Sequence, residues 1–178
     1  PGHDSLPIRS YIKEEGKWEM HHPLEDVDKV EMDIETYLNS VGEVFQAFRE
    51  QDSTCISYGV LSSGRRWFVK HSENPQGLAS LKRAYKLNMG VRHEALPRLH
   101  NRFATLYGVS LVYDWVPGES LYAGSRYTPE QLRDDPTVPR VRFWSLPADD
   151  IVESLNTIFD VQLTLAGRGY IAVDLYDG

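Results

Sequence analysis

The segment that most constrains the fold is residues 111–121, where an apolar run meets the sequence Asp-Trp-Val-Pro-Gly-Glu. The run at residues 111–113 is typical of a strand. Pro117 cannot donate a hydrogen bond to a sheet, and Gly118 turns easily, so the strand is expected to end just before them. Residues 117–118 are therefore expected to turn the chain out of the sheet.

The charge and the single cysteine exclude several classes of protein. The chain has 178 residues, a formal net charge of -7 and a pI of about 5.3, whereas nucleic acids and anionic membranes require a concentrated positive face. Cys55 is the only cysteine, so no internal disulfide can form and a cytoplasmic location is expected. No apolar run approaches the roughly 20 residues of a membrane span. We therefore expect neither a nucleic acid nor a membrane as a partner.

The first half of the chain carries signals for a hairpin and for helices. Residues 33–48 have apolar side chains at helical spacing, but a strand beginning at Val44 fits equally well, and the sequence leaves both open. Residues 55–61 and 66–70 are rich in β-branched and aromatic side chains and flank a Ser-Ser-Gly turn, which predicts a hairpin. Asn74 followed by proline predicts the start of a helix that ends near residue 90.

The second half is predicted to be less regular until its last helix. Two short strands are expected at residues 96–99 and 107–116. Residues 122–148, rich in Pro, Arg and Asp, are expected to be mostly loop, with one short helix capped by Thr128. Residues 149–166 place apolar side chains on one broad stripe, which predicts an amphipathic helix.

Three motifs occur in an order that is typical of one superfamily. Trp-Phe-Val-Lys stands at residues 67–70, the strand and turn follow at 111–121, and Gly-Tyr-Ile-Ala-Val-Asp-Leu stands at 169–175. From about Val44 to its last residue the chain resembles the protein-kinase-like superfamily, and within it bacterial serine/threonine-kinase-like proteins. The resemblance implies an α+β fold, with an antiparallel sheet and one helix as the N-lobe and an incomplete, helical C-lobe.

The same resemblance implies a domain organisation. Residues 1–32 have mixed charge and no periodicity, and are expected to be an N-terminal extension. Residues 33–116 would form the kinase-like N-lobe. Residues 117–178 would form a partial C-lobe that reaches the catalytic loop.

The resemblance also implies how ATP would be bound. Lys70 would bind the α- and β-phosphates. Tyr113 would stand at the gate of the adenine pocket, and Asp114 would direct its carbonyl toward the adenine amino group. Val116 would offer its backbone N–H and C=O, and Trp115 would wall the pocket or cap its mouth.

Asp174 matches the catalytic aspartate, which accepts the hydroxyl proton of the phosphate acceptor and orients it. The sequence departs from the family pattern around it. Ala-Val at residues 172–173 replaces His-Arg, and Tyr176 stands where protein kinases usually place a lysine. The missing arginine removes the usual contact to a phosphorylated activation loop. Asp177 is either a substitute metal ligand or an ordinary loop residue, and we assign no metal ligand.

Two further kinase features are not found in the sequence. Glu94 is too close to the strand at residues 107–116 to lie on the preceding helix, and Pro97 would break that helix. The register instead puts Ala84 near the position of the acid that usually pairs with the lysine. Residues 50–54, the expected first hairpin turn, contain no glycine for a phosphate-binding loop.

These features predict a fragment of an ATP-dependent phosphotransferase that resembles a serine/threonine protein kinase. In the parent protein, Lys70 and Asp174 would act with ATP and Mg²⁺. The sequence stops before a second metal-binding aspartate, so the fragment itself is expected to be inactive. Two alternatives remain: a small-molecule kinase of the aminoglycoside or choline type, and a pseudokinase-like regulatory module that binds partners without turnover.

The apolar stripe on residues 149–166 leads to one further expectation. In a complete kinase-like lobe this stripe would be packed inside the lobe. Leaving it uncovered would cost more than the net stability of a typical domain. Self-association of the chain is therefore expected.

Overall fold

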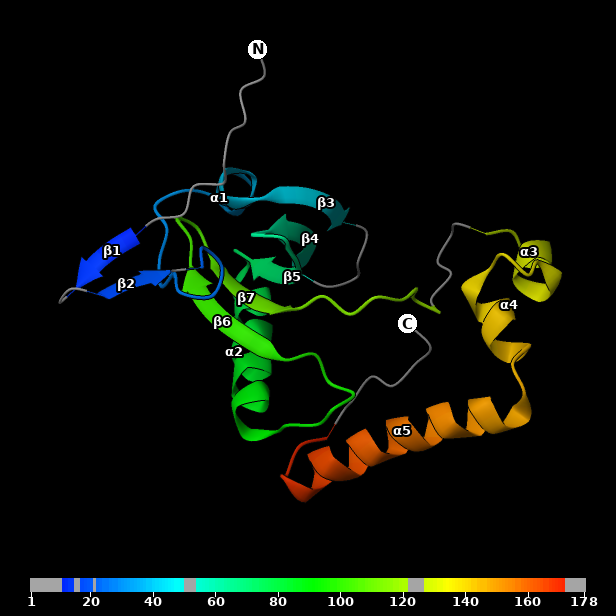
Figure 1. The fold of residues 1–178 in the computed structure, drawn as a ribbon. Coiled ribbons are helices and arrows are strands. Elements are labelled where there is room, and N and C mark those ends of the chain that lie inside the picture. The colour runs from blue at the N-terminus through cyan, green and yellow to red at the C-terminus, as the bar shows by residue number, and fades with distance from the viewer. Residues whose placement is uncertain (1–10, 15–16, 21, 50–53, 122–126, 172–178) are drawn as a thin grey trace, which may run out of the picture. The chain divides into compact units, whose positions relative to one another are not determined.

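The chain is α+β and divides into two compact units in this computed structural model (Figure 1). The first unit comprises residues 1–92 and 97–116, and the second comprises residues 93–96 and 117–178. The structure describes the following residues, with side chains from residue 22 onward: 11–14, 17–20, 22–49, 54–121 and 127–171.

The first unit is built on a five-stranded antiparallel sheet with the order β3-β4-β5-β7-β6. One helix, α2 (Pro75–Gly90), connects β5 to β6 and packs on the sheet (Figure 1). This arrangement is compatible with a kinase N-lobe. The strands are β3 (Glu43–Phe48), β4 (Ile56–Ser62), β5 (Arg65–Ser72), β6 (Leu99–Ala104) and β7 (Val109–Asp114). A separate antiparallel pair consists of β1 (Tyr11–Glu14) and β2 (Lys17–Met20).

The central strand β5 divides its side chains between two different faces. Trp67 and Val69 are fully buried on one face, in a core shared with α1 (Ile34–Val41). Phe68 lies on the other face, where α2 contributes Leu81 to a second, smaller core. Because side chains alternate along a strand, Lys70 shares the face of Phe68.

Residues 33–48 form a helix and then a strand, which settles the alternative that the sequence leaves open. The Asp33 carboxylate accepts a hydrogen bond from the Thr36 backbone N–H at 2.9 Å and caps α1. Gly42 then separates α1 from β3. A Cβ atom at Gly42 would lie 2.5 Å from the Leu61 carbonyl oxygen, so only glycine permits this close approach of the two strands.

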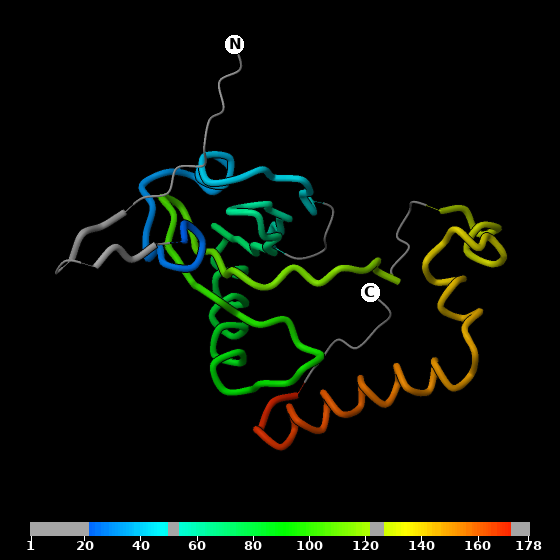
Figure 2. The backbone as a smooth tube through the Cα atoms, viewed as in Figure 1, coloured from blue at the N-terminus to red at the C-terminus, as the bar shows by residue number. Residues whose placement is uncertain are grey.

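Residues 22–32, expected to belong to an N-terminal extension, instead pack against the sheet (Figure 2). Leu24 is 0% exposed, and Val30 belongs to the same core. The Val30 N–H donates to the Ala104 carbonyl, and the Ala104 N–H donates to the Asp28 carbonyl, both at 2.9 Å. The sequence concealed this because the buried side chains are too far apart to show a period. We call residues 22–32 the strap.

The predicted hairpin and the predicted helix after it are both confirmed. β4 and β5 pair antiparallel around Ser63 and Gly64, which have φ values of 51° and 77°. The Asn74 side chain accepts from the Gln76 N–H at 2.8 Å and caps α2, with proline in its first turn. Cys55, just before β4, is buried in the core that contains Leu81 of α2. Its Sγ lies 3.9 Å from the Gly77 carbonyl oxygen in the first turn of α2.

The strand expected at residues 96–99 is wrong, because β6 begins only at Leu99 and runs to Ala104. Pro97 disfavours pairing before that point. The sequence His-Asn-Arg-Phe-Ala at residues 100–104 is polar and resembles a turn. It forms a strand because β7 and the strap pair with it from two sides.

The second unit is helical, with α3 (Pro129–Asp134), α4 (Pro139–Trp144) and α5 (Ala148–Gly167). The Thr128 hydroxyl and the Gln131 side chain form a capping box on α3, which confirms the predicted helix. The loop expected over α4 is wrong; α4 has no side-chain cap and is too short for a clear periodicity. None of the described helices has the length and apolar character needed to cross a membrane.

Candidate functional site

Lys70 lies on the α2 face of the sheet with side chains from both neighbouring strands. Ser57 on β4 and Leu111 on β7 pair with Lys70 from its two sides. Two residues earlier on β5, Phe68 pairs in the same way with Gly59 on β4 and with Tyr113 on β7. Directly paired residues of antiparallel strands share a face, so these side chains form one continuous surface.

The Lys70 ammonium group has no ion-pair partner among the residues that the structure describes. Ala84 lies on α2, half-buried against the core that contains Leu111. Glu94 lies in the loop after α2 and is exposed. The lysine is therefore available to an anionic ligand from outside the described part of the chain.

Trp115 folds back onto this face and joins an aromatic cluster, which we define as Phe45, Phe48, Phe68 and Trp115. The Trp115 ring lies 4.9 Å from Phe45, 6.4 Å from Phe48 and 6.4 Å from Phe68, measured between ring centroids. A Cβ atom at Gly59 would lie 2.6 Å from the Phe45 ring and 2.8 Å from the Trp115 ring. Glycine at this position therefore makes room for the two rings.

The backbone leaves the sheet after Asp114, which still pairs with Trp67, so β7 ends two residues before the strand end expected at Val116. The Asp114 N–H donates to the Arg98 carbonyl at 3.1 Å, and β7 ends at this residue. Val116 is 60% exposed, and no hydrogen bond to its backbone is found within the described ranges. Tyr113 is buried, and this burial raises the pKa of its hydroxyl to about 12, so the hydroxyl stays neutral.

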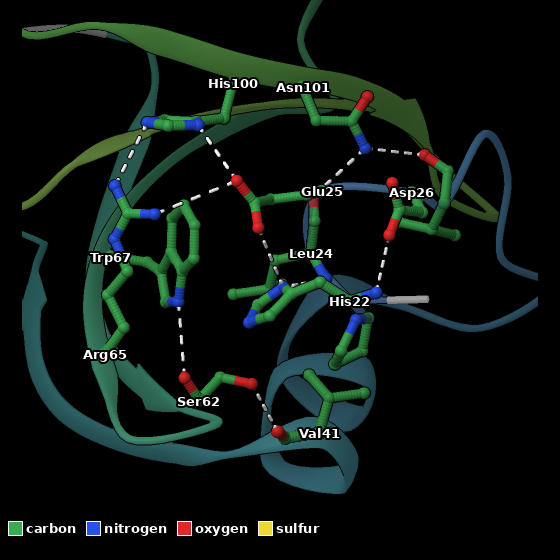
Figure 3. A network of polar contacts seen from close by, with 12 residues as sticks. His22, Leu24, Glu25, Asp26, Val41, Ser62, Arg65, Trp67, His100 and Asn101 are labelled. Carbon is green, nitrogen blue, oxygen red and sulfur yellow. Dashed lines mark hydrogen bonds and ion pairs between the residues drawn. The ribbon is translucent and has the colours of Figure 1, made fainter. Parts of the chain in front are cut away.

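The Asp114 side chain points to the opposite face and is held by a network of charged residues. The Asp114 carboxylate contacts Arg65, and its Oδ1 lies 2.9 Å from His100 Nε2. The other ring nitrogen of His100 lies 3.0 Å from the Glu25 carboxylate of the strap, as Figure 3 shows. Burial alone would raise the pKa of Asp114, but the hydrogen bonds and charges of His100 and Arg65 lower it.

This network packs on Trp67. The Arg65 guanidinium lies 4.2 Å from the centroid of the Trp67 ring, and the His100 ring lies 5.1 Å from it (Figure 3). Sequence reasoning missed Glu25, Arg65 and His100 as residues that position the crossover. No local motif marks them, because they come from the strap, β5 and β6 and meet only in the folded sheet.

The other predicted site residue, Asp174, lies outside the described residues, as does most of the expected phosphate loop at residues 50–54. Its predicted role therefore stays a prediction. Of the six predicted site residues, the structure brings together Lys70, Tyr113 and Trp115 on one face. Asp114 contributes to the crossover through its backbone and anchors it through its side chain. The described ranges contain no group of three or more His, Cys, Asp or Glu side chains that could hold a metal ion.

No family model and no curated protein matches the chain. Among solved structures, it is weakly similar to the protein kinase Rad53, residues 1–466, in complex with AMP-PNP. The TM-score is 0.37 and the identity 14%, over 47% of this chain. The chain matches only 23% of the length of the Rad53 chain, and a likeness at this level carries no argument about function.

Proposed function

We propose that the first unit is the nucleotide-binding part of an ATP-dependent phosphotransferase that resembles a serine/threonine protein kinase. The observation that carries the proposal is that Lys70, without an ion-pair partner in the described chain, shares one sheet face with Trp115. The next residue, Val116, is exposed, and no hydrogen bond to its backbone is found within the described ranges. One end of this face offers a cation and the other offers aromatic rings and backbone hydrogen-bonding groups. ATP has negatively charged phosphates at one end and an aromatic base with hydrogen-bonding groups at the other, so it matches the two ends of this face.

The distances along the sheet support this arrangement. Phe68 and Lys70 are two residues apart on one strand, which is about 7 Å. An adenine ring placed against Trp115 and Val116 would therefore have its phosphates on the Lys70 side. Stacking of a base on an aromatic side chain contributes about 1–3 kcal/mol, and Lys70 would bind a phosphate as a point charge.

The later steps of the reaction depend on residues beyond those described. In this proposal Asp174 accepts the hydroxyl proton of the phosphate acceptor. Mg²⁺ would neutralise the phosphates, but the described ranges contain no group of three or more His, Cys, Asp or Glu side chains that could hold it, and we derive no step through it. What the described residues do is bind the base, orient the phosphates and keep Asp114 in place.

One observation favours a second function, a pseudokinase-like module that binds partners without turnover. In the kinase motif V-A-I-K a small alanine stands two residues before the lysine. This chain has Phe68 there, and the aromatic cluster fills the space over Gly59. In this second function the protein's own aromatic rings occupy the place of the base. They would fix the crossover in one conformation, which another protein could then recognise.

A thermal-shift titration separates the two functions. If the chain binds ATP, saturating ATP raises the unfolding temperature, because a ligand at 100 times its Kd stabilises by about 2.7 kcal/mol. Lys70→Ala should abolish most of this shift. Lys82→Ala, on the exposed part of α2, is the matched control and should keep it. No shift with ATP in the wild type would overturn the proposal and leave the partner-binding module. An undiminished shift in Lys70→Ala would overturn the proposed role of Lys70 in binding the phosphates.

A further inference from the structure

Ser57 differs from the other serines buried in the sheet of the first unit. Its side chain lies in β4 and the residue is 1% exposed, yet its Oγ has no hydrogen-bond partner among the described residues. The hydroxyls of Ser62 and Ser72 each donate to a backbone carbonyl at 2.7 Å. The Ser110 hydroxyl lies 3.0 Å from a ring nitrogen of His71. A buried hydroxyl without a partner is costly in a folded protein, so its retention calls for a reason.

The position of Ser57 supplies the reason. In the sheet register Ser57 pairs directly with Lys70 on one side and with Phe48 on the other. Paired residues on one face have Cβ atoms about 4.5–5.5 Å apart. An uncompensated hydroxyl therefore lies beside the residue Lys70, whose ammonium group has no ion-pair partner in the described chain. Together they provide an uncharged donor and a cation for the same ligand atom.

We infer that Ser57 is a further binding residue, whose hydroxyl donates a hydrogen bond to the anionic group that Lys70 binds. The ligand would be a nucleoside di- or triphosphate, and the inference rests on the function proposed above. Its phosphate end would lie over the β4–β5 pair, on the side of Lys70 away from Leu111. Because Ser57 is buried, binding moves the flexible Lys70 side chain aside until both groups reach one phosphate oxygen.

Ser57→Ala tests this inference with two readouts that move in opposite directions. The variant removes an uncompensated hydroxyl from a buried site, so its unfolding temperature without ligand should stay the same or rise. Its affinity for ATP should fall by roughly tenfold or more, because a hydrogen bond to a charged group is lost. Its affinity for adenosine, which has no phosphate, should stay unchanged. Isothermal titration calorimetry measures both affinities.

Ser110→Ala is the matched control, a buried serine of the same sheet on the other face with a hydrogen-bonded hydroxyl. It should lower the unfolding temperature and leave the ratio of ATP to adenosine affinity as in the wild type. If Ser57→Ala destabilises as much as Ser110→Ala, or keeps the ATP affinity while Lys70→Ala loses it, the role of Ser57 is overturned and the nucleotide site stands. If the wild type does not bind ATP, the proposed function fails and the inference fails with it.

Discussion

At the scale of single residues, His71 makes the stability of the first unit depend on pH. It is 2% exposed, with one ring nitrogen 3.0 Å from Ser110 Oγ and the other 3.4 Å from the Glu73 carboxylate. Burial lowers the pKa of His71 below its ordinary value of 6.5, although Glu73 acts to raise it. The unfolded chain therefore binds more protons than the folded one below about pH 6.5, and stability falls as the pH falls toward the pKa of the folded state.

We expect the unfolding temperature to drop between about pH 7.5 and about pH 5.5, and His71→Gln to reduce this drop. Glu73→Gln should enlarge it, because removing the carboxylate lowers the pKa of His71 further. Thermal unfolding followed by circular dichroism at the two pH values measures both effects. An equal drop in all three proteins would contradict the assignment to His71.

The residues of the candidate site differ in how well the sequence reveals them. The strand that carries Lys70 and the strand that ends before Pro117 were predictable, because an apolar strand before a lysine and a Pro-Gly turn are local patterns. Ser57 was not, because serine in a strand is ordinary and only the register places it beside Lys70. Glu25 and His100 were not, because an ion pair between segments this far apart leaves no local trace.

At the scale of elements, the strap is predicted to stabilise the sheet through Asn101. The Asn101 side-chain amide donates to the Leu24 carbonyl at 3.0 Å and to the Val27 carbonyl at 2.7 Å (Figure 3). Asn101→Ala leaves the carbonyls of the buried Leu24 and the half-buried Val27 without this donor, which should lower the free energy of unfolding by about 1–3 kcal/mol. Urea unfolding measures the change. Asn156→Ala, on the exposed surface of α5, should change it little, and equal effects of the two variants would argue against a structural role for the strap.

Elements with strong local signals were predictable, and those that depend on tertiary partners were not. α2 begins with a capping asparagine and a proline, and those two residues fix its start without help from the rest of the chain. β6 is a polar sequence that forms a strand because β7 and the strap pair with it. The strap itself has its buried side chains at irregular spacing. Local patterns therefore predicted the central hairpin and α2, but they did not predict β6 or the strap that packs on the sheet.

At the scale of the whole molecule, α5 predicts self-association. Among the described residues of the second unit, Phe159 and Leu163 on this helix are 63% and 71% exposed, and Val152, Leu155 and Ile158 are also exposed. A contiguous apolar surface of this kind is stabilised when it is covered, at about 25 cal/mol per Å². We expect the chain to form dimers or larger species at micromolar concentration. The double variant Phe159→Ser, Leu163→Ser should shift it toward monomer in sedimentation velocity.

The control is Thr157→Ser on the same helix, which changes an exposed residue without removing a large apolar side chain. It should associate as the wild type does. A wild type that sediments as a strict monomer would refute the prediction for α5. The class of fold, α+β with an antiparallel sheet, and the apolar stripe of α5 were accessible from the sequence, whereas how far each side chain of the stripe is exposed required the structure of the second unit.

The burial of Cys55 gives the chain an intrinsic reporter. It is the only cysteine, and its sulfur lies beside the Gly77 carbonyl where α2 begins over the sheet. Because the thiol is buried, a thiol reagent reaches it only when the structure around it opens locally, so the modification rate of the native protein measures that local opening. A ligand that tightens this region would slow the labelling, and every modified molecule would carry the mark at one known position.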